Sequence, residues 1–217
     1  MNIEKDGEIM CNFEYAMTTK NQYLKEIVPH LKEKYGTERA EAVIEAAWKR
    51  FEAICEENAG EPKAYDMHTK DRIYPAIACL QAMTEAGIDR QEAIDFLHGY
   101  YIWRAEGKAK VLKKMMNIPG LYKLMPKLFN KLTPKMFGDA AGFRSVWHED
   151  PEWDLSFDMV KCPYHEKCKA YGCPELCKAY CDADDVCYGD LHPKVVWGRT
   201  KTLGKGGDCC DFRMKVL

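Results

Sequence analysis

The chain has 217 residues, a net charge of -2 at neutral pH and an isoelectric point near 6.3. Hydrophobic residues make up 47% and aromatic residues 12% of the sequence, which is enough for a sizeable core and excludes a disordered chain. The balanced charge gives no reason to expect a nucleic-acid partner. No apolar run approaches the roughly 20 residues that a membrane-spanning helix needs.

The beginning of the chain, residues 1–18, predicts a loose lead-in without regular structure. It carries acidic residues where a secretory signal needs a basic and then an apolar region. We therefore expect a cytoplasmic protein. Its eleven cysteines are then expected to be thiols, metal ligands or catalysts rather than disulfides.

The first half of the chain shows the apolar periodicity of helices. Residues 20–57 predict two amphipathic helices with a break at Gly36. A third helix is predicted over 71–86. A fourth is predicted over 89–116, with Asp89 as its N-cap and a glutamate three positions later, as in a capping box.

Residues 104–135, here called the basic segment, carry nine basic residues against one acidic residue, a net charge of +8. Leucines run beside lysines along its predicted helical surface, at Leu121, Leu124, Leu128 and Leu132 and at Lys123, Lys127 and Lys131. The segment could bind anionic lipid or an acidic partner, or attract an anionic substrate. The sequence favours a fourth interpretation, a solvated basic face on a helix that packs on the core. A membrane surface is therefore not expected as a partner.

Beyond Gly138 the pattern changes from helices to strands. Strands are predicted at 143–147, 153–160, 194–202 and 210–216, and a helix at 174–186. A glycine-rich turn between the last two strands predicts an antiparallel hairpin.

Helices followed by strands predict an α+β fold, in which N-terminal helices pack with a C-terminal antiparallel sheet that short cysteine-bearing helices interrupt. We expect a helical region, 1–138, and a cysteine-rich α+β region, 139–217, in one compact unit. The sequence contains no P-loop and no dinucleotide-binding fingerprint.

Eight of the eleven cysteines are concentrated near the C-terminus. They are Cys162, Cys168, Cys173, Cys177, Cys181, Cys187, Cys209 and Cys210. Their spacing matches neither the paired ligands of zinc ribbons and fingers nor the cysteine run of bacterial ferredoxins. Spacing alone therefore does not require a metal.

Two of the predicted elements arrange these cysteines. A helix over 174–186 places Cys177 and Cys181 one turn apart on one face, with Asp184 following on the same side. In the last strand, alternation predicts that Cys210 points to the core and that Cys209 does not.

From about Trp153 to the C-terminus, the chain resembles the L-2-amino-thiazoline-4-carboxylic acid hydrolase family. The pieces that agree in order and spacing are Cys162-Pro163, Gly172, Pro174-Glu175-Leu176, Cys181 with Asp184, His192-Pro193, Arg199-Thr200 with Thr202-Leu203, and Cys210-Asp211-Phe212-Arg213. The sequence departs from the family pattern by its extra cysteines at 168, 173, 177, 187 and 209.

The resemblance implies a hydrolase that opens a cyclic amidine, such as 2-amino-thiazoline-4-carboxylate, to a carbamoyl-cysteine. The candidate nucleophiles or metal ligands are Cys162, Cys181 and Cys210, and Asp184 is the candidate general acid or base. Arg199 and Thr202 are the candidate substrate-binding residues, with Arg199 as the clamp for the substrate carboxylate.

Each candidate also has a structural alternative. Cys210 can be a core residue, Asp184 can hold a turn, and Arg199 can pair with Asp211 across the hairpin. The extra cysteines leave open a module that binds zinc or an iron-sulfur cluster, and the third alternative is a non-catalytic protein that binds a small ligand. For the hydrolase, the expected partner is an anionic small molecule. The oligomeric state cannot be predicted.

Overall fold

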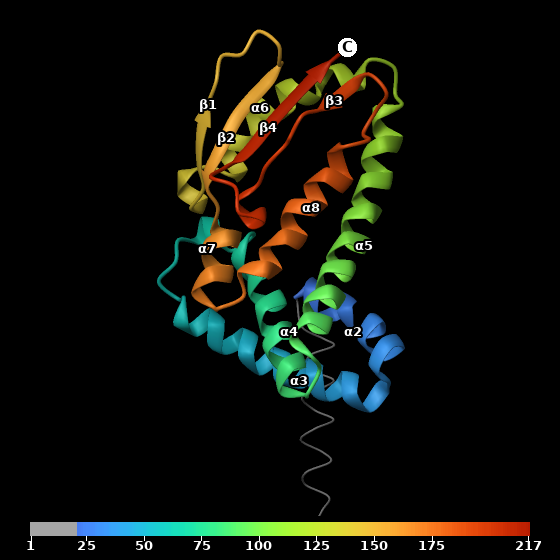
Figure 1. The fold of residues 1–217 in the computed structure, drawn as a ribbon, viewed down its shortest axis with the longest axis vertical. Coiled ribbons are helices and arrows are strands. Elements are labelled where there is room, and N and C mark those ends of the chain that lie inside the picture. Colours follow the sequence, from blue (N-terminus) through green and yellow to red (C-terminus); the bar gives the residue numbers. More distant parts are fainter. Residues whose placement is uncertain (1–20) are drawn as a thin grey trace, which may run out of the picture. The chain divides into compact units, whose positions relative to one another are not determined.

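The computed structural model describes residues 21–217, and the predicted lead-in at 1–18 lies outside this part of the chain (Figure 1). The chain forms two compact units, of which the first ends at Tyr100 and the second begins at Tyr101. This division falls inside one long helix. It differs from the predicted regions 1–138 and 139–217, which follow the change from helices to strands.

The first unit is helical. Its elements are α2 (Gln22–Tyr35), α3 (Thr37–Glu57), the short turns η1 (Lys63–Tyr65) and η2 (Thr69–Ile73), α4 (Tyr74–Glu85) and the first part of α5 (Arg90–Met116). The predicted break at Gly36 is confirmed, and this glycine has φ of +80°. The predicted cap of α5 is confirmed as well, because the Asp89 carboxylate accepts hydrogen bonds from the backbone amides of Gln91 at 2.9 Å and Glu92 at 3.1 Å.

The second unit combines helices with a sheet (Figure 1). Its helices after α5 are η3 (Leu121–Leu124), α6 (Met125–Met136), η4 (Asp139–Ala141), α7 (Pro163–Ala170), η5 (Pro174–Leu176), α8 (Cys177–Tyr188) and η6 (Leu203–Lys205). Its strands are β1 (Arg144–Trp147), β2 (Leu155–Lys161), β3 (Val195–Trp197) and β4 (Cys210–Val216). The strands lie in the order β1-β2-β4-β3, and all neighbours are antiparallel. The predicted α+β class is therefore confirmed.

The hairpin of β3 and β4 forms as predicted, but β3 is shorter than the predicted strand at 194–202. The reason lies in Asp211 of β4. Its carboxylate accepts the backbone amides of Thr200 at 3.0 Å and Lys201 at 2.7 Å, so these amides bond to a side chain instead of a neighbouring strand. The chain leaves the sheet at this point and continues toward η6.

Two further predictions differ from the structure. Residues 163–170 form α7, although no helix was predicted there; Pro163 at its first position is a recognised start signal. Cys209 was predicted to point away from the core, but it is only 4% exposed, and the next two residues, Cys210 and Asp211, are buried as well.

No helix in the described part of the chain is both long enough and apolar enough to cross a bilayer.

Candidate active site

Helix α8 carries two thiols one turn apart, and the η6 turn lies against them. Cys177 and Cys181 are both buried. A Cβ atom at Gly204 would lie 2.8 Å from the Cys181 sulfur and 3.2 Å from the Cys177 sulfur. Only a glycine therefore lets the backbone of η6 approach the two sulfurs this closely.

The sulfur of Cys181 is surrounded by hydrogen-bond donors. The thiols of Cys177 and Cys210, and then the Gly204 amide, lower the pKa of the Cys181 thiol against the opposing effect of burial. The same contacts raise the pKa values of Cys177 and Cys210, which act as donors. Cys181 is therefore the sulfur of this group that is best stabilised as a thiolate.

The contacts continue beyond Cys181 and form what we call the thiol row, which consists of Cys173, Cys168, Cys177, Cys181 and Cys210. Cys168 also has a lowered pKa, chiefly because the Cys173 thiol donates to it, while the single S–H proton of Cys177 can serve either Cys168 or Cys181; the Cys168 side chain is fully buried. Cys181 keeps 8% of its surface exposed. Of the two sulfurs with a lowered pKa, Cys181 is therefore the less enclosed.

Cys162, another predicted nucleophile, precedes α7. Burial raises the pKa of its thiol to about 12. At neutral pH this sulfur is a neutral thiol, which is a weak nucleophile.

Asp184 lies one turn beyond Cys181 on α8. Burial raises the pKa of its carboxyl to about 7, although the nearby Arg199 guanidinium acts in the opposite direction. This burial is only partial, because 40% of the side-chain surface is exposed. A carboxyl that titrates near neutral pH and touches solvent can both donate and accept a proton.

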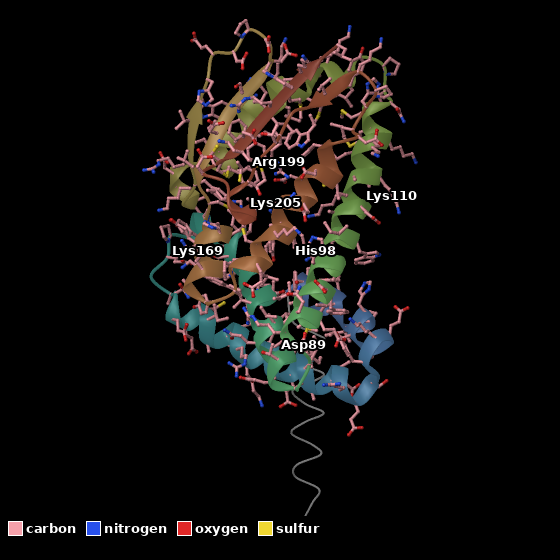
Figure 2. The ribbon with its side chains drawn as sticks, in the orientation of Figure 1. Asp89, His98, Lys110, Lys169, Arg199 and Lys205 are labelled. Carbon is pink, nitrogen blue, oxygen red and sulfur yellow. The ribbon has the colours of Figure 1, made fainter. Side chains whose placement is uncertain are left out.

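Arg199 holds this end of α8 together (Figure 2). Its side chain is 1% exposed, and its guanidinium lies 3.0 Å from the Asp184 carboxylate and 2.7 Å from the Asp185 carboxylate. It also donates to the backbone carbonyl of Cys181. The alternative pairing of Arg199 with Asp211 is wrong.

Lys205 of η6 adds an accessible positive charge to this region (Figure 2). Its ammonium lies 2.6 Å from the Asp182 carboxylate and 3.7 Å from that of Asp185, and its side chain is 40% exposed. Neither Lys205 nor Gly204 could be recognised from the sequence, because the segment LGKGG predicts only a turn.

The structure brings together most of the predicted site residues. Cys181, Cys210 and Thr202 meet at one sulfur, and Asp184 and Arg199 lie beside them on and against α8. Thr202 is 2% exposed, and its hydroxyl has no partner in good hydrogen-bond geometry within the described residues. The predicted use of Arg199 as a substrate clamp would require its guanidinium to exchange one of its present partners.

Replacement of Gly204 by alanine tests the close approach of η6. The new methyl group would overlap the Cys181 and Cys177 sulfurs, so we expect Gly204→Ala to destabilise the fold by about 1–3 kcal/mol. Denaturant unfolding measures the change. The matched control is Gly107→Ala in α5, where the added Cβ meets nothing within 4 Å and stability should stay equal or rise. Equal stability of Gly204→Ala and the parent would contradict the close packing of η6 on the Cys177 and Cys181 sulfurs.

Asp211 offers a second, pH-dependent test. Burial acts to raise the pKa of its carboxyl, but the hydrogen bonds from Thr200 and Lys201 outweigh it and hold the pKa below its usual value. The bonds therefore stabilise the fold above the unfolded pKa of about 4, and the contribution is lost as the pH falls through the folded pKa. We expect Asp211→Asn to cost about 1–3 kcal/mol at pH 7 and progressively less below pH 4. Denaturant unfolding at several pH values measures this. A difference in unfolding free energy between Asp211→Asn and the parent that does not change with pH would contradict the assignment.

Within residues 21–217, no group of three or more histidine, cysteine, aspartate or glutamate side chains has an arrangement that could hold a metal ion. The predicted metal-ligand role of Cys162, Cys181 and Cys210 therefore has no ligand set to support it.

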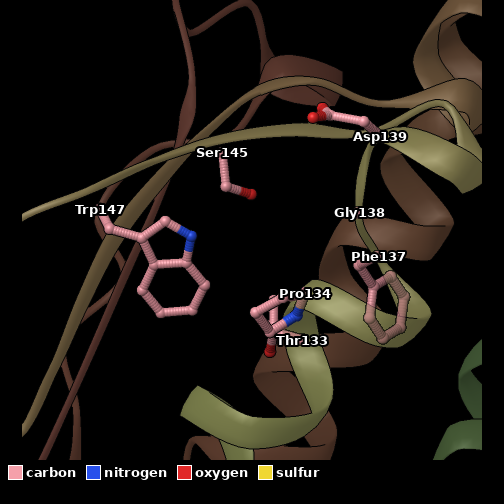
Figure 3. Close-up of a pocket in the computed structure, with 7 residues that line it drawn as sticks. All are labelled: Thr133, Pro134, Phe137, Gly138, Asp139, Ser145 and Trp147. Atoms are coloured by element: carbon pink, nitrogen blue, oxygen red, sulfur yellow. The ribbon is translucent and has the colours of Figure 1, made fainter.

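The second unit also has a pocket of about 150 Å³ at another place, where the end of α6 faces β1 (Figure 3). It is lined by Thr133, Pro134, Phe137, Gly138, Asp139, Ser145 and Trp147. None of the predicted site residues is among them, and the lining offers no strong nucleophile. The chemistry therefore points to Cys181 and not to this pocket.

Fold and site together define an α+β protein with a thiol and carboxyl centre. The chain belongs to the L-2-amino-thiazoline-4-carboxylic acid hydrolase family, which it matches over residues 66–214. The match is wider than the C-terminal third from which the resemblance was inferred, and it includes α4, α5 and α6. Comparisons with curated proteins and with solved structures gave no match.

Proposed function

We propose that the protein hydrolyses a cyclic amidine such as 2-amino-thiazoline-4-carboxylate to a carbamoyl-cysteine, with Cys181 as the nucleophile. The observation that carries the proposal is the position of the Cys181 sulfur, which packs beside the Cys177 sulfur and against Gly204 of η6, one helical turn from Asp184. The neighbouring thiols of Cys177 and Cys210 lower the pKa of Cys181 there. Membership of the hydrolase family supports the reaction class. The choice of substrate is our inference.

In the first step, the Cys181 thiolate attacks the amidine carbon of the ring, and the bond from that carbon to the ring sulfur breaks. The protonated Asp184 carboxyl gives its proton to the departing sulfur. The carbon is then joined to the Cys181 sulfur as an isothiourea. A carboxyl with a pKa of about 7 suits this transfer, because a useful fraction of it is protonated at neutral pH.

In the second step, water attacks the same carbon and the bond to the Cys181 sulfur breaks. One water proton returns to the Asp184 carboxylate, and the other goes to the former ring nitrogen. The oxygen becomes the urea carbonyl, and Cys181 leaves as a thiolate. The net reaction adds one water molecule, so neither an oxidant nor a reductant is needed.

In this proposal Arg199 is a positioning residue. Its guanidinium fixes the Asp184 carboxylate and the Cys181 carbonyl, which sets the orientation of both reacting groups. The substrate carboxylate would meet the accessible ammonium of Lys205 rather than the fully buried guanidinium.

The experiment is incubation of the full chain with L-2-amino-thiazoline-4-carboxylate, followed by chromatography and mass spectrometry of the product. We expect carbamoyl-cysteine to accumulate far beyond one equivalent of protein. Binding without turnover would support the non-catalytic alternative. Activity that is lost to a chelator and restored by zinc would favour the metal-binding alternative.

A further inference from the structure

Helix α6 exposes an unusual amount of apolar surface. Leu124, Leu128, Leu132 and Met136, here called the apolar stripe, are between 37% and 51% exposed. They are spaced four residues apart: Leu124 is the last residue of η3, and the other three follow one another along α6. The sequence favoured a helix whose apolar side packs on the core. The helix does pack on the sheet and its lysines are exposed, as that interpretation expects, but the apolar stripe is exposed as well.

The side of α6 that does pack on the protein is a different one. Met125 and Thr133 are buried, and Phe129 is half-buried against the Tyr188 ring at 5.0 Å. These residues serve the contacts of α6 with the sheet, where the helix meets β2 and β4. The core therefore covers only part of the apolar surface of α6, and the apolar stripe remains exposed to solvent.

A row of lysines accompanies the apolar stripe. Lys123, Lys127, Lys131 and Lys135, the lysine stripe, each precede a residue of the apolar stripe. All four are exposed, and none has a carboxylate within ion-pair distance among the described residues. Between Gly107 and Gly138 the sequence contains eight lysines and no aspartate or glutamate. The field over this surface is therefore uncompensated and positive.

The preceding part of the chain has the same character. Val111, Met115 and Ile118, at the end of α5 and just beyond it, are 46% to 60% exposed. Single exposed apolar residues are ordinary, but seven within one acid-free stretch are not.

We propose that α6 binds the surface of an anionic phospholipid bilayer, lying in the interface with the apolar stripe among the acyl chains and the lysine stripe at the headgroup phosphates. This combination of exposed leucines and lysines on one helix is what interfacial helices use. A second copy of the chain is disfavoured, because two lysine-rich faces would repel each other. Nucleic acid is disfavoured, because it would leave the leucines in water.

The test uses the full chain and sedimentation with lipid vesicles at about 0.1 M salt. Vesicles of phosphatidylcholine alone are compared with vesicles that contain about 30% phosphatidylserine. We expect binding to the anionic vesicles only, and a strong loss of binding at about 1 M salt. Equal binding to both lipids, or binding to neither, would overturn the proposal.

Two double variants separate the contributions of the stripes. Lys127→Glu with Lys131→Glu should weaken binding by at least about tenfold, since each lysine near an anionic surface contributes about fivefold. Leu128→Ser with Leu132→Ser should weaken it as well while leaving the net charge unchanged. The affected side chains are exposed, so thermal unfolding should match the parent.

The matched control is Lys25→Glu with Lys63→Glu, which makes the same change in net charge on exposed residues of the first unit. Its vesicle binding should stay close to that of the parent. If the control weakens binding as much as the α6 variant, attraction by total charge and not by α6 is responsible, and the proposal fails. It also fails if the leucine variant only dissociates an oligomer of the chain without changing vesicle binding.

Discussion

Cys181→Ser is expected to lower the turnover of 2-amino-thiazoline-4-carboxylate by roughly 10⁴-fold or more, because Asp184 must be protonated in the first step and so cannot act as the base that a serine hydroxyl needs. The donors around the sulfur stabilise a thiolate, and they cannot ionise a serine, whose pKa is far higher. Steady-state kinetics of the purified variant measure the effect.

The matched control is Cys187→Ser on the same helix. The Cys187 thiol lies outside the thiol row and contacts the Ala105 carbonyl at 3.7 Å, a contact that serine can keep. Cys168→Ser should likewise retain turnover, since that sulfur is fully buried. Activity of Cys181→Ser close to the parent would refute the assignment of the nucleophile.

Asp184→Asn is expected to lower kcat/KM by about 10²–10⁴-fold, the usual contribution of a general acid. The parent should also lose activity as the pH rises through about 7, because the raised pKa of Asp184 means that its carboxyl deprotonates there and can no longer give a proton to the ring sulfur. The variant should lack this decline. Arg199 keeps its contact with Asp185, so the variant should still fold.

A pH profile of kcat/KM from pH 5 to pH 9 makes this comparison, with thermal unfolding as a check on the fold. If the decline above neutral pH persists unchanged in Asp184→Asn, another group is the acid.

The helix predicted over 174–186 is close to the observed α8, which begins at Cys177 after the η5 turn and ends at Tyr188, because its position depends on local spacing. Helical period alone places Cys177, Cys181 and Asp184 on one side, and alternation alone predicts β4 at its observed bounds. The surroundings of the Cys181 sulfur could not be predicted this way. They depend on η6 and β4, which are distant in the chain, and on the absence of a side chain at Gly204.

Two features could not be predicted from local pattern alone. Residues 198–202 have strand composition, but the Asp211 carboxylate accepts hydrogen bonds from the amides of Thr200 and Lys201, which therefore do not pair with a strand. The leucines of the basic segment have the spacing of a core face, and periodicity cannot tell a core from a surface that another partner covers. Only the burial of Met125 and Thr133 shows which side of α6 meets the sheet.

The central claim is that Cys181 forms a covalent bond to the substrate. The most direct measurement is mass spectrometry of the full chain quenched with acid within milliseconds to seconds of mixing with 2-amino-thiazoline-4-carboxylate, followed by peptide mapping. The account predicts an increase by the mass of one substrate molecule, located on Cys181 and absent from Cys181→Ser. Turnover without any adduct in the parent, or an adduct on another cysteine that forms and decays at the rate of turnover, would contradict it.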